Sequence, residues 1–457
     1  MRILGRVARL ALPPAGTFPA SERLKPYVSR LAIEWLREEP DRRHRSIDGT
    51  LVFADISGFT SLTERLSRKG KVGAEEMNDL LDSVFTELLS VAYDYGASVI
   101  KWGGDATLLL FTGDDHPAHA CRAAVEMQRT MRSVGRLGTS AGRVTLRMSV
   151  GIHSGLFDFF FVGKLHRELV VAGPAANETV EAESVSEAGE IVISAATAAA
   201  LETALVGPAR APGFLLARAP KLEVDRTPGV GDVHDIDLVR CVPAAISGHL
   251  IAGGGEAEHR PLTIAFIQFA GTDELLAAEG PEAVADALEH CIDTVEGLAL
   301  ERKVAFFDTD IAAGGGKMLL VSGAPTSSGN DEERMLRALR AIADAGPALP
   351  LQIGVNRGRI FAADFGPPYR RTYSFKGDAA NLAARLMAKS APGQILATDD
   401  VLTRSRTEFD AEPLEPFEVK GKSARCRRTP SGRRKACEPT TPRLRSSAAR
   451  RSSESCS

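Results

Sequence analysis

Two aspartates, each at the end of an apolar segment, could form a site for divalent cations. Asp55 directly follows the run Leu51-Val52-Phe53-Ala54, and Asp105 lies in the turn of Lys101-Trp102-Gly103-Gly104-Asp105-Ala106, between two apolar runs. When such strands are neighbours, their ends bring the two carboxylates together at one edge of a sheet. Converging carboxylates beside a glycine-bearing loop suit a pair of hard cations, which in turn hold phosphates.

The elements around these aspartates are expected to form an α+β unit. Apolar periodicity and turn residues predict a strand, two helices, a hairpin, a helix, further strands, a helix and a last strand. The expected strands are 51–56, 97–102, 106–111, 144–153, 157–162, 168–172 and 191–193, and the expected helices begin near 60 and cover 74–93, 117–133 and 174–186.

The segment from residue 262 onward repeats this order without either aspartate. Its expected strands are 262–268, 303–308, 317–322, 350–356, 359–364, 372–376 and 395–397, and its expected helices are 280–299, 332–344 and 378–390. Two units in one order indicate a duplicated domain. Each unit is expected to be ferredoxin-like (βαββαβ), with its helices on one face of the sheet.

Stretches rich in Pro and Gly divide the chain into five parts. The predicted parts are an N-terminal helical lead-in (1–45), a first domain (46–205), a linker with a closing strand (206–257), a second domain (258–423) and a basic tail (424–457). The tail carries ten Arg/Lys against two Glu and lacks the periodicity of a core, so disorder is expected there. It is either the remnant of a longer chain or a basic arm for anionic partners.

Composition limits the class of protein. The hydrophobic fraction is 44% and the net charge is −3, and outside the basic tail the chain is acidic, which argues against a nucleic-acid partner. The apolar start, residues 1–12, is short and holds three Arg, so neither a membrane span nor a signal peptide is expected. Six Cys without CxxC spacing fit free thiols in a reducing cytosol. A cytoplasmic protein is therefore predicted.

Four motifs stand out along the chain. The first half contains Phe53-Ala54-Asp55-Ile56-Ser57-Gly58-Phe59-Thr60 and Lys101-Trp102-Gly103-Gly104-Asp105-Ala106, and the second contains Gly377-Asp378-Ala379-Ala380-Asn381-Leu382-Ala383-Ala384-Arg385-Leu386 and Val419-Lys420-Gly421-Lys422. Together they resemble class III nucleotide cyclases, and within them the soluble branch that carries two cyclase domains in one chain. The resemblance covers most of residues 22–423. It implies a head-to-tail pairing of the two domains as an intramolecular pseudo-heterodimer, with the nucleotide between them.

The resemblance also implies metal and phosphate ligands. Asp55, Asp105 and the carbonyl group of Ile56 would hold two Mg²⁺ or Mn²⁺ ions. Backbone N–H groups of Gly58, Phe59 and Thr60, at a helix N-terminus, would hold phosphate oxygens. Lys420 is a further candidate phosphate ligand, with a solvated surface lysine as an equal alternative.

The second domain would contribute the remaining groups. Asn381 would orient the ribose, and Arg385, one helical turn later, would stabilise charge on the α-phosphoryl group. Ser374 and Lys317 are the candidate base-binding residues, although the alignment places Phe306 where related enzymes use a lysine to select adenine. The implied reaction converts ATP, or alternatively GTP, to a 3′,5′-cyclic nucleotide and pyrophosphate.

The motifs of the two halves complement one another. Gln268 stands opposite Asp55 and Lys317 opposite Asp105, while Asn177 and Glu181 stand opposite Asn381 and Arg385. One complete site per chain is therefore expected, from Asp55 and Asp105 with Asn381 and Arg385. The other cleft would be a decayed site or a regulatory pocket.

Other interpretations of these residues remain open. Taken alone, Asp55 could cap a strand and Asp105 could be an ordinary turn residue. Val180 occupies the place of an arginine that bicarbonate-responsive relatives use beside Lys101, so the match to their bicarbonate pocket is incomplete. Diguanylate cyclases share the Gly-Gly-Asp turn but need an acidic residue where Ala106 stands. The main rival is a non-catalytic nucleotide-sensing module, within a longer chain that includes an ATPase.

Overall fold

The structure is a computed structural model that describes residues 19–103, 105–224, 226, 229–412, 414–417 and 426–431. It contains two eight-stranded sheets with the same strand order, β2-β3-β1-β6-β8-β10-β9 and β12-β13-β11-β14-β16-β18-β17. In each sheet one more strand extends the pairing, β7 on β6 and β15 on β14. The α+β architecture with a duplicated domain is thereby confirmed.

The first half begins with two short helices and continues into its sheet. Its helices are α1 (Pro19–Leu24), α2 (Arg30–Glu38), α3 (Phe59–Ser67), α4 (Gly70–Asp94), α5 (His116–Val134), α6 (Pro174–Ser184) and α7 (Ala195–Ala199). Its strands are β1 (His44–Ser57), β2 (Ser98–Gly103), β3 (Ala106–Phe111), β6 (Arg147–Val162), β7 (Glu168–Ala172), β8 (Ile191–Ile193), β9 (Val206–Arg210) and β10 (Gly213–Leu216), with a separate hairpin of β4 (Arg136–Thr139) and β5 (Gly142–Thr145).

The second half follows a connecting helix, α8 (Ala244–Ile251). Its helices are α9 (Thr272–Glu279), α10 (Pro281–Glu301), α11 (Asp331–Asp344), α12 (Asp378–Lys389) and α13 (Asp399–Thr403). Its strands are β11 (Glu258–Ala270), β12 (Ala305–Ala312), β13 (Gly315–Ser322), β14 (Leu351–Phe365), β15 (Thr372–Lys376), β16 (Ile395–Thr398), β17 (Leu414–Phe417) and β18 (Cys426–Ser431).

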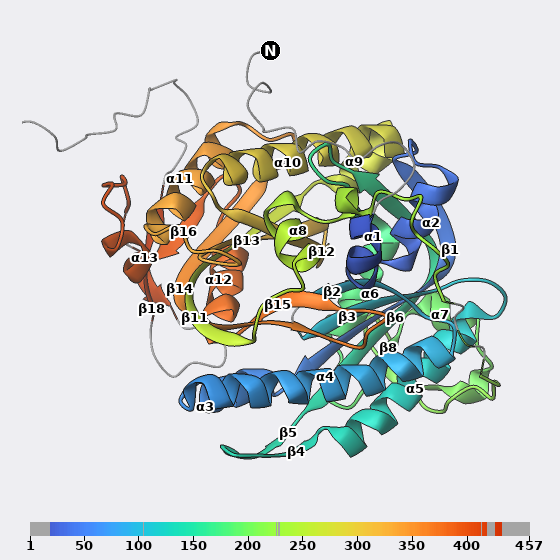
Figure 1. The fold of residues 1–457 in the computed structure, drawn as a ribbon. Coiled ribbons are helices and arrows are strands. Elements are labelled where there is room, and N and C mark those ends of the chain that lie inside the picture. The colour runs from blue at the N-terminus through green and yellow to red at the C-terminus, as the bar shows by residue number, and fades with distance from the viewer. Residues whose placement is uncertain are drawn as a thin grey trace, which may run out of the picture.

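Helices α4 and α5 cover the outer face of the first sheet, and α10 and α11 cover that of the second. The expectation of helices on one face is wrong for α6 and α12, which pack on the opposite faces, where a Cβ atom on Gly151 or Gly354 would meet their backbones. In Figure 1, α4 and α5 lie along the lower side of the molecule and α10 and α11 along the upper side, with the strands between them. In α4 the buried side chains Met77, Leu81, Phe85 and Leu88 recur every three or four residues, so one stripe of the helix packs on the sheet. Among the described residues no helix is both long and apolar enough to cross a bilayer.

Two pairs of expected strands are single long strands. The expected strands 144–153 and 157–162 are mostly joined in β6, and 350–356 and 359–364 are joined in β14. The reason lies in the partner half: Phe160 and Val162 pack in the core beneath α10 and α11, while Phe361 and Phe365 pack in the core beneath α4 and α5. Each long strand thus starts in its own domain and ends in the core of the other.

A third apolar core lies between the halves. It joins Phe53 and Phe159 of the first half to Phe307 and Phe375 of the second, together with Trp35 of the lead-in helix α2. Burying this much apolar surface stabilises the pairing of the domains through the hydrophobic effect. The expected intramolecular pairing is what the structure contains.

The predicted disorder of the tail is wrong for residues 426–431. Residues 426–431 form β18, which pairs antiparallel with β16 and with β17, so the part of the tail described by the structure belongs to the second sheet. Its place matches that of β10 in the first sheet. The Arg-rich composition hid this strand because ladder hydrogen bonds join backbone groups and do not require apolar side chains.

Candidate active site

Asp55 and Asp105 line the same cavity. Asp55 lies near the end of β1, opposite Ala106 of β3, and the N–H group of Ile56 donates to the carbonyl oxygen of Asp105 at 3.1 Å. This pairing holds the end of β1 against the turn between β2 and β3. The cavity has a volume of about 680 Å³ and receives both aspartates.

The electrostatics around this pair suit a divalent cation. Burial, followed by the negative charges of Asp105 and Glu183, raises the pKa of Asp55 to about 7. Glu183, from α6, lines the same cavity and accepts a hydrogen bond from Ser149 Oγ at 2.9 Å. Carboxylates that repel one another in a partly buried site gain most from a cation between them. The donor set therefore fits Mg²⁺ or Mn²⁺.

The loop after Asp55 requires glycine. Gly58 has φ +108°, and a Cβ atom there would lie 3.1 Å from both Leu146 Cδ2 and the carbonyl oxygen of Thr145. Helix α3 begins at the next residue, Phe59, whose side chain is buried and stacks on Phe85 with ring centroids 6.1 Å apart. Gly58, Phe59 and Thr60 would thus offer backbone N–H groups to a phosphate. Lys420 lies outside the described residues.

The second half contributes Ser374 and Asn381 to the cavity. Ser374 is on β15, opposite Ala363, and is 9% exposed, while Asn381 is on α12. Arg385 follows one turn later on α12 and is half-buried, but it is not among the described residues that line the cavity. The structure thus brings Asp55 and Asp105 together with Ser374 and Asn381, and leaves Arg385 beside them.

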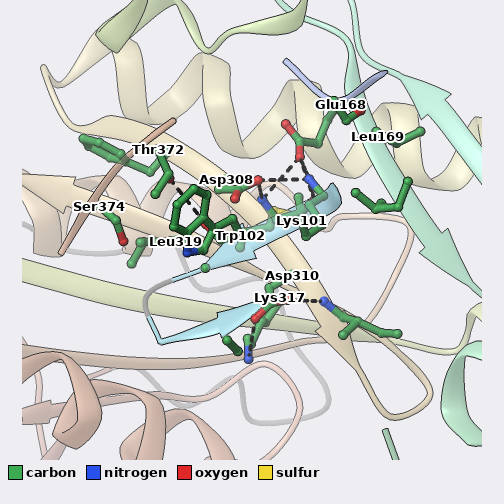
Figure 2. A pocket seen from close by; sticks show the side chains of 18 of the residues that line it. Lys101, Trp102, Glu168, Leu169, Asp308, Asp310, Lys317, Leu319, Thr372 and Ser374 are labelled. Atoms are coloured by element: carbon green, nitrogen blue, oxygen red, sulfur yellow. Dashed lines mark hydrogen bonds and ion pairs between the residues drawn. The ribbon is translucent and has the colours of Figure 1, made fainter. Parts of the chain in front are cut away.

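Lys317 lies near the aspartates. Its Nζ atom is 2.9 Å from Asp310 Oδ2, across the β12–β13 hairpin (Figure 2). Burial opposes its charge, but Asp310, Asp105 and Asp55 together raise its pKa. The ammonium group of Lys317 therefore balances carboxylate charge in the cavity.

Strand register gives the correspondence between the halves directly. Asp55 pairs with Ala106 and Ser149, and Gln268 pairs with Lys317 and Gln352, so Gln268 corresponds to Asp55 as expected. Lys317 consequently corresponds to Ala106, one residue beyond the position expected from the alignment by eye. The offset arises because the second hairpin is longer than the first. Its strands stay paired beyond Asp310 and Lys317 as far as Ala312 and Gly315, whereas the first hairpin ends at the corresponding pair, Gly103 and Ala106.

The same register confirms the remaining correspondences. Asp158 pairs with Ala172 and Phe361 with Lys376, so the helices that follow align Asn177 with Asn381 and Glu181 with Arg385. Asn177 is occupied by contacts between the halves: its Oδ1 atom accepts from the N–H group of Gly314 at 2.7 Å, and its Nδ2 group donates to Asp273.

Phe306, which the sequence alignment places where related enzymes use a lysine to select adenine, does not lie at the cavity. Phe306 is buried in the core of the second sheet and cannot contact a base in the cavity. Asp308, on the same strand, lines the cavity with a side chain that is 40% exposed. A bulge between Phe306 and Asp308 shifts the alternation of the strand, which the sequence pattern does not reveal.

A charge network reaches the cavity through Lys101, Glu168 and Asp308. Lys101 Nζ donates to Asp308 Oδ1 at 2.9 Å and to Glu168, and these contacts are drawn in Figure 2. The His166 ring lies between Glu168 (2.9 Å) and Glu296 (2.7 Å). This network was not predicted from the sequence, where its signal is the charged run 164–168 between two apolar strands.

Lys376 was missed as well. It ends β15 and is 5% exposed, and it directly precedes the glycine before α12. Burial lowers its pKa to about 8, against the opposing effect of Asp105 and Asp55. A lysine after the apolar Phe375 in a buried strand was the available signal.

Comparisons with known proteins agree with this geometry. The sequence model of the family described as "Adenylate and Guanylate cyclase catalytic domain" matches residues 42–224 and again 256–429. The chain is 22% identical to "Adenylate cyclase type 10" of Homo sapiens over 390 residues, which cover 74% of this chain and 24% of the relative. It is 30% identical over 192 residues to "Uncharacterized protein Rv1318c" of Mycobacterium tuberculosis, which cover 39% and 33% of the two chains.

A solved structure shares the fold across both halves. The "Class III adenylyl cyclase-like ATP-binding protein from Pseudomonas aeruginosa" superimposes with a TM-score of 0.57 at 12% identity, covering 79% of this chain and 85% of the other. The chain spans about a quarter of the length of the adenylate cyclase type 10 relatives. On its two family matches and its paired sheets, the chain belongs to the class III adenylate and guanylate cyclase family, in the branch that carries two cyclase domains in tandem.

Proposed function

We propose that the chain converts a purine nucleoside triphosphate, ATP in the first instance, to its 3′,5′-cyclic monophosphate and pyrophosphate. The observation that carries this proposal is the cavity in which Asp55 and Asp105 of the first half face Ser374 and Asn381 of the second. Neither half alone holds both sets. A single site per chain follows, because the corresponding positions of the other cleft hold Gln268 and Glu181.

In the reaction, the ribose 3′-oxygen attacks the α-phosphorus in line, its proton is lost, and the bond to the β-phosphate oxygen breaks to release pyrophosphate. Two Mg²⁺ or Mn²⁺ ions, when bound, would lower the pKa of the 3′-hydroxyl group and neutralise triphosphate charge. Asp55, Asp105 and the Ile56 carbonyl group are the proposed metal ligands. Glu183 adds negative charge beside them.

The remaining residues bind and orient the nucleotide. N–H groups from Gly58 to Thr60, at the N-terminus of α3, hold phosphate oxygens, since the helix dipole favours an anion there. Asn381 fixes the ribose. Arg385 reaches the α-phosphoryl group once its side chain turns from the surface of α12 toward the cavity, and there it stabilises the charge that develops on the phosphoryl oxygens.

GTP is the second candidate substrate, and Asp308 is the observation that favours it. A carboxylate in the cavity can accept hydrogen bonds from the N1–H and 2-amino groups of guanine, whereas adenine lacks both donors. Ser374 can donate to the guanine 6-oxygen or accept from the adenine 6-amino group, so it serves either base.

The test is a turnover assay of the full chain with ATP and GTP separately, each with Mg²⁺ and then Mn²⁺, with cyclic products separated from linear ones. We expect a cyclic nucleotide whose formation falls more than about 100-fold in Asp105→Asn, because loss of even an outer partner of a metal ligand costs 10–100-fold. Arg404→Ala, an exposed change at a residue that pairs with Asp400, serves as a control that keeps wild-type turnover.

The rival function is a nucleotide sensor without turnover. The position of Arg385 outside the cavity and the two lysines beside the aspartates favour it, and the structural neighbour from Pseudomonas aeruginosa is named as an ATP-binding protein. Nucleotide binding to the folded chain, with no cyclic product from either nucleotide and either metal, would refute the cyclase proposal and support the sensor.

A further inference from the structure

The lead-in segment between α1 and α2 is fastened to the hairpin of β14 and β15. The carbonyl oxygen of Pro26 accepts from the N–H group of Arg371 at 2.8 Å and from Nη1 of Arg370 at 3.1 Å. The hydroxyl group of Tyr27, the next residue, donates to Asp364 Oδ2. Nε of Arg371 donates to the other carboxylate oxygen, Oδ1, at 3.0 Å. Together these contacts form a latch between the lead-in and the second half.

The lead-in that carries the latch is itself held on both sides. The Oγ atom of Ser21, a fully buried residue of α1, donates to the carbonyl oxygen of Ile236 at 2.6 Å and accepts from the N–H group of Leu238 at 3.1 Å. Trp35 of α2 is fully buried in the core between the halves. Between these two points, the ring of Pro26 fixes one backbone angle. The lead-in therefore gives the hairpin a fixed support.

The turn of the same hairpin also contacts the first half. The N–H group of Gly366 donates to Asp82 Oδ1 of α4 at 2.6 Å. Gly366 has φ +115°, and a Cβ atom there would lie 2.6 Å from Trp102 Cη2, so only glycine permits this approach to β2. Thr372 Oγ1 donates to the carbonyl oxygen of Trp102 at 3.4 Å. The hairpin is thus positioned by the lead-in, by α4 and by β2.

The latch acts on the strand that carries Ser374. Asp364 pairs with Tyr373 across the hairpin, and the next pair is Ala363 with Ser374. Strand β15 has five residues and, in the part of the chain that the structure describes, pairs with β14 alone. A short strand at the edge of a sheet has few ladder hydrogen bonds to hold it. Its place at the cavity therefore depends on the contacts made at its ends.

We infer that Tyr27 is a positioning residue for the base side of the cavity, because its hydrogen bond to Asp364 holds β15, and with it Ser374, where a purine nucleotide binds. The inference rests on the proposed function, in which Ser374 contacts the base. When only a fraction of the molecules holds β15 in place, the apparent dissociation constant rises by the inverse of that fraction. Bound nucleotide restores the arrangement, so turnover of the saturated chain stays the same.

The test is Tyr27→Phe in the full chain, which removes one hydroxyl group and keeps the ring that lines the cavity. A hydrogen bond to a carboxylate is stronger than one between neutral groups, so we expect KM and the dissociation constant of the substrate nucleotide to rise about three- to tenfold. We expect kcat to change less than about twofold. Hydrogen–deuterium exchange over residues 366–376 should become faster without nucleotide and return to the wild-type rate at saturation.

Two further variants isolate the hydrogen bond. Tyr369→Phe is the matched control, because Tyr369 lies in the same hairpin turn, is 49% exposed and packs edge-on against Tyr93 with ring centroids 5.2 Å apart. It should leave KM, kcat and exchange unchanged. In an Asp364→Ala background, Tyr27→Phe should add little to the rise in KM, since the partner of the hydroxyl group is already gone.

The readouts separate the possible outcomes. A lower kcat at unchanged KM, or faster exchange with unchanged nucleotide affinity, would overturn the positioning role, because a merely structural residue behaves in this way. Weaker nucleotide binding at unchanged exchange would also overturn it, and would assign the hydroxyl group to a direct contact with the nucleotide.

Failure of the proposed function gives a different pattern. If the wild-type chain binds a nucleotide but forms no cyclic product, the cyclase proposal fails, and the dissociation constants of wild type and Tyr27→Phe still decide the role of Tyr27. A folded wild-type chain that binds neither ATP nor GTP would overturn both.

Discussion

Lys101 and Asp308 occupy corresponding positions in the two halves, and they form an ion pair with each other, Nζ to Oδ1 at 2.9 Å. Nearby, the corresponding residues Gly103 and Asp310 also meet, since a Cβ atom on Gly103 would lie 3.5 Å from Asp310 Oδ2. A pair of identical first halves would place lysine against lysine there, and a pair of second halves aspartate against aspartate. The opposite charges therefore favour pairing of the two different halves.

We expect Lys101→Met to destabilise the chain by about 3–5 kcal/mol, because it leaves the buried carboxylate of Glu168, and that of Asp308 beside it, without their shared cation. Denaturant unfolding measures the loss. Adding Asp308→Asn should recover part of it, so that the two changes cost less together than in sum. Lys164→Met, which breaks an exposed pair with Glu289, should cost less than about 1 kcal/mol. Equal losses in Lys101→Met and Lys164→Met would contradict the role of the network.

His166 makes stability depend on pH on the alkaline side. Burial opposes its charge, but Glu168 and Glu296 raise its pKa to about 9, above its ordinary value of 6.5. A group whose pKa is raised on folding contributes full stability below the unfolded pKa and loses it as the pH rises through the folded pKa. Unfolding free energy should therefore fall between about pH 6.5 and 9.

His166→Gln should flatten this decline, since glutamine can still donate to one carboxylate but does not titrate. The measurement is urea unfolding at a series of pH values for both proteins. An unaltered alkaline slope in the variant would show that the histidine is not the group responsible.

Arg385→Ala should lower kcat about 100-fold or more, as expected when a group that stabilises developing charge is removed. Because Arg385 is not among the described residues that line the cavity, the dissociation constant for ATP should change far less. Single-turnover rates and equilibrium binding separate the two effects. A loss confined to binding would assign Arg385 to ground-state contacts instead.

Asp308→Asn tests which base the cavity prefers. If the carboxylate accepts from guanine, the variant should lower kcat/KM for GTP relative to ATP by about tenfold, because it loses one acceptor and places an amide donor against a donor. Parallel assays with both nucleotides give the ratio. Asp286→Asn, on the exposed face of α10, is the matched control. An unchanged ratio in Asp308→Asn would exclude this residue from base recognition.

The local pattern of apolar and turn residues predicts a large part of the fold and the place of the two aspartates. The order of strands and helices, its repetition, and the placement of Asp55 and Asp105 on adjacent strand ends follow from periodicity and turn residues. The sequence also shows that Asn381 and Arg385 lie in the second half and the two aspartates in the first, because the residues of each motif lie within one short segment.

The contacts that surround these motifs were determined by the tertiary structure alone. The contact of Tyr27 with Asp364, the pair of Lys101 with Asp308 and the His166–Glu296 contact each join residues from different halves. The ends of β6 and β14 are also buried by the opposite domain, and the bulge at Phe306 turns Asp308 into the cavity. Sequence patterns report the contacts that a segment makes with itself and with one face of its own sheet. Charge compensation and burial between domains depend on segments more than a hundred residues apart, so the folded pairing determines them.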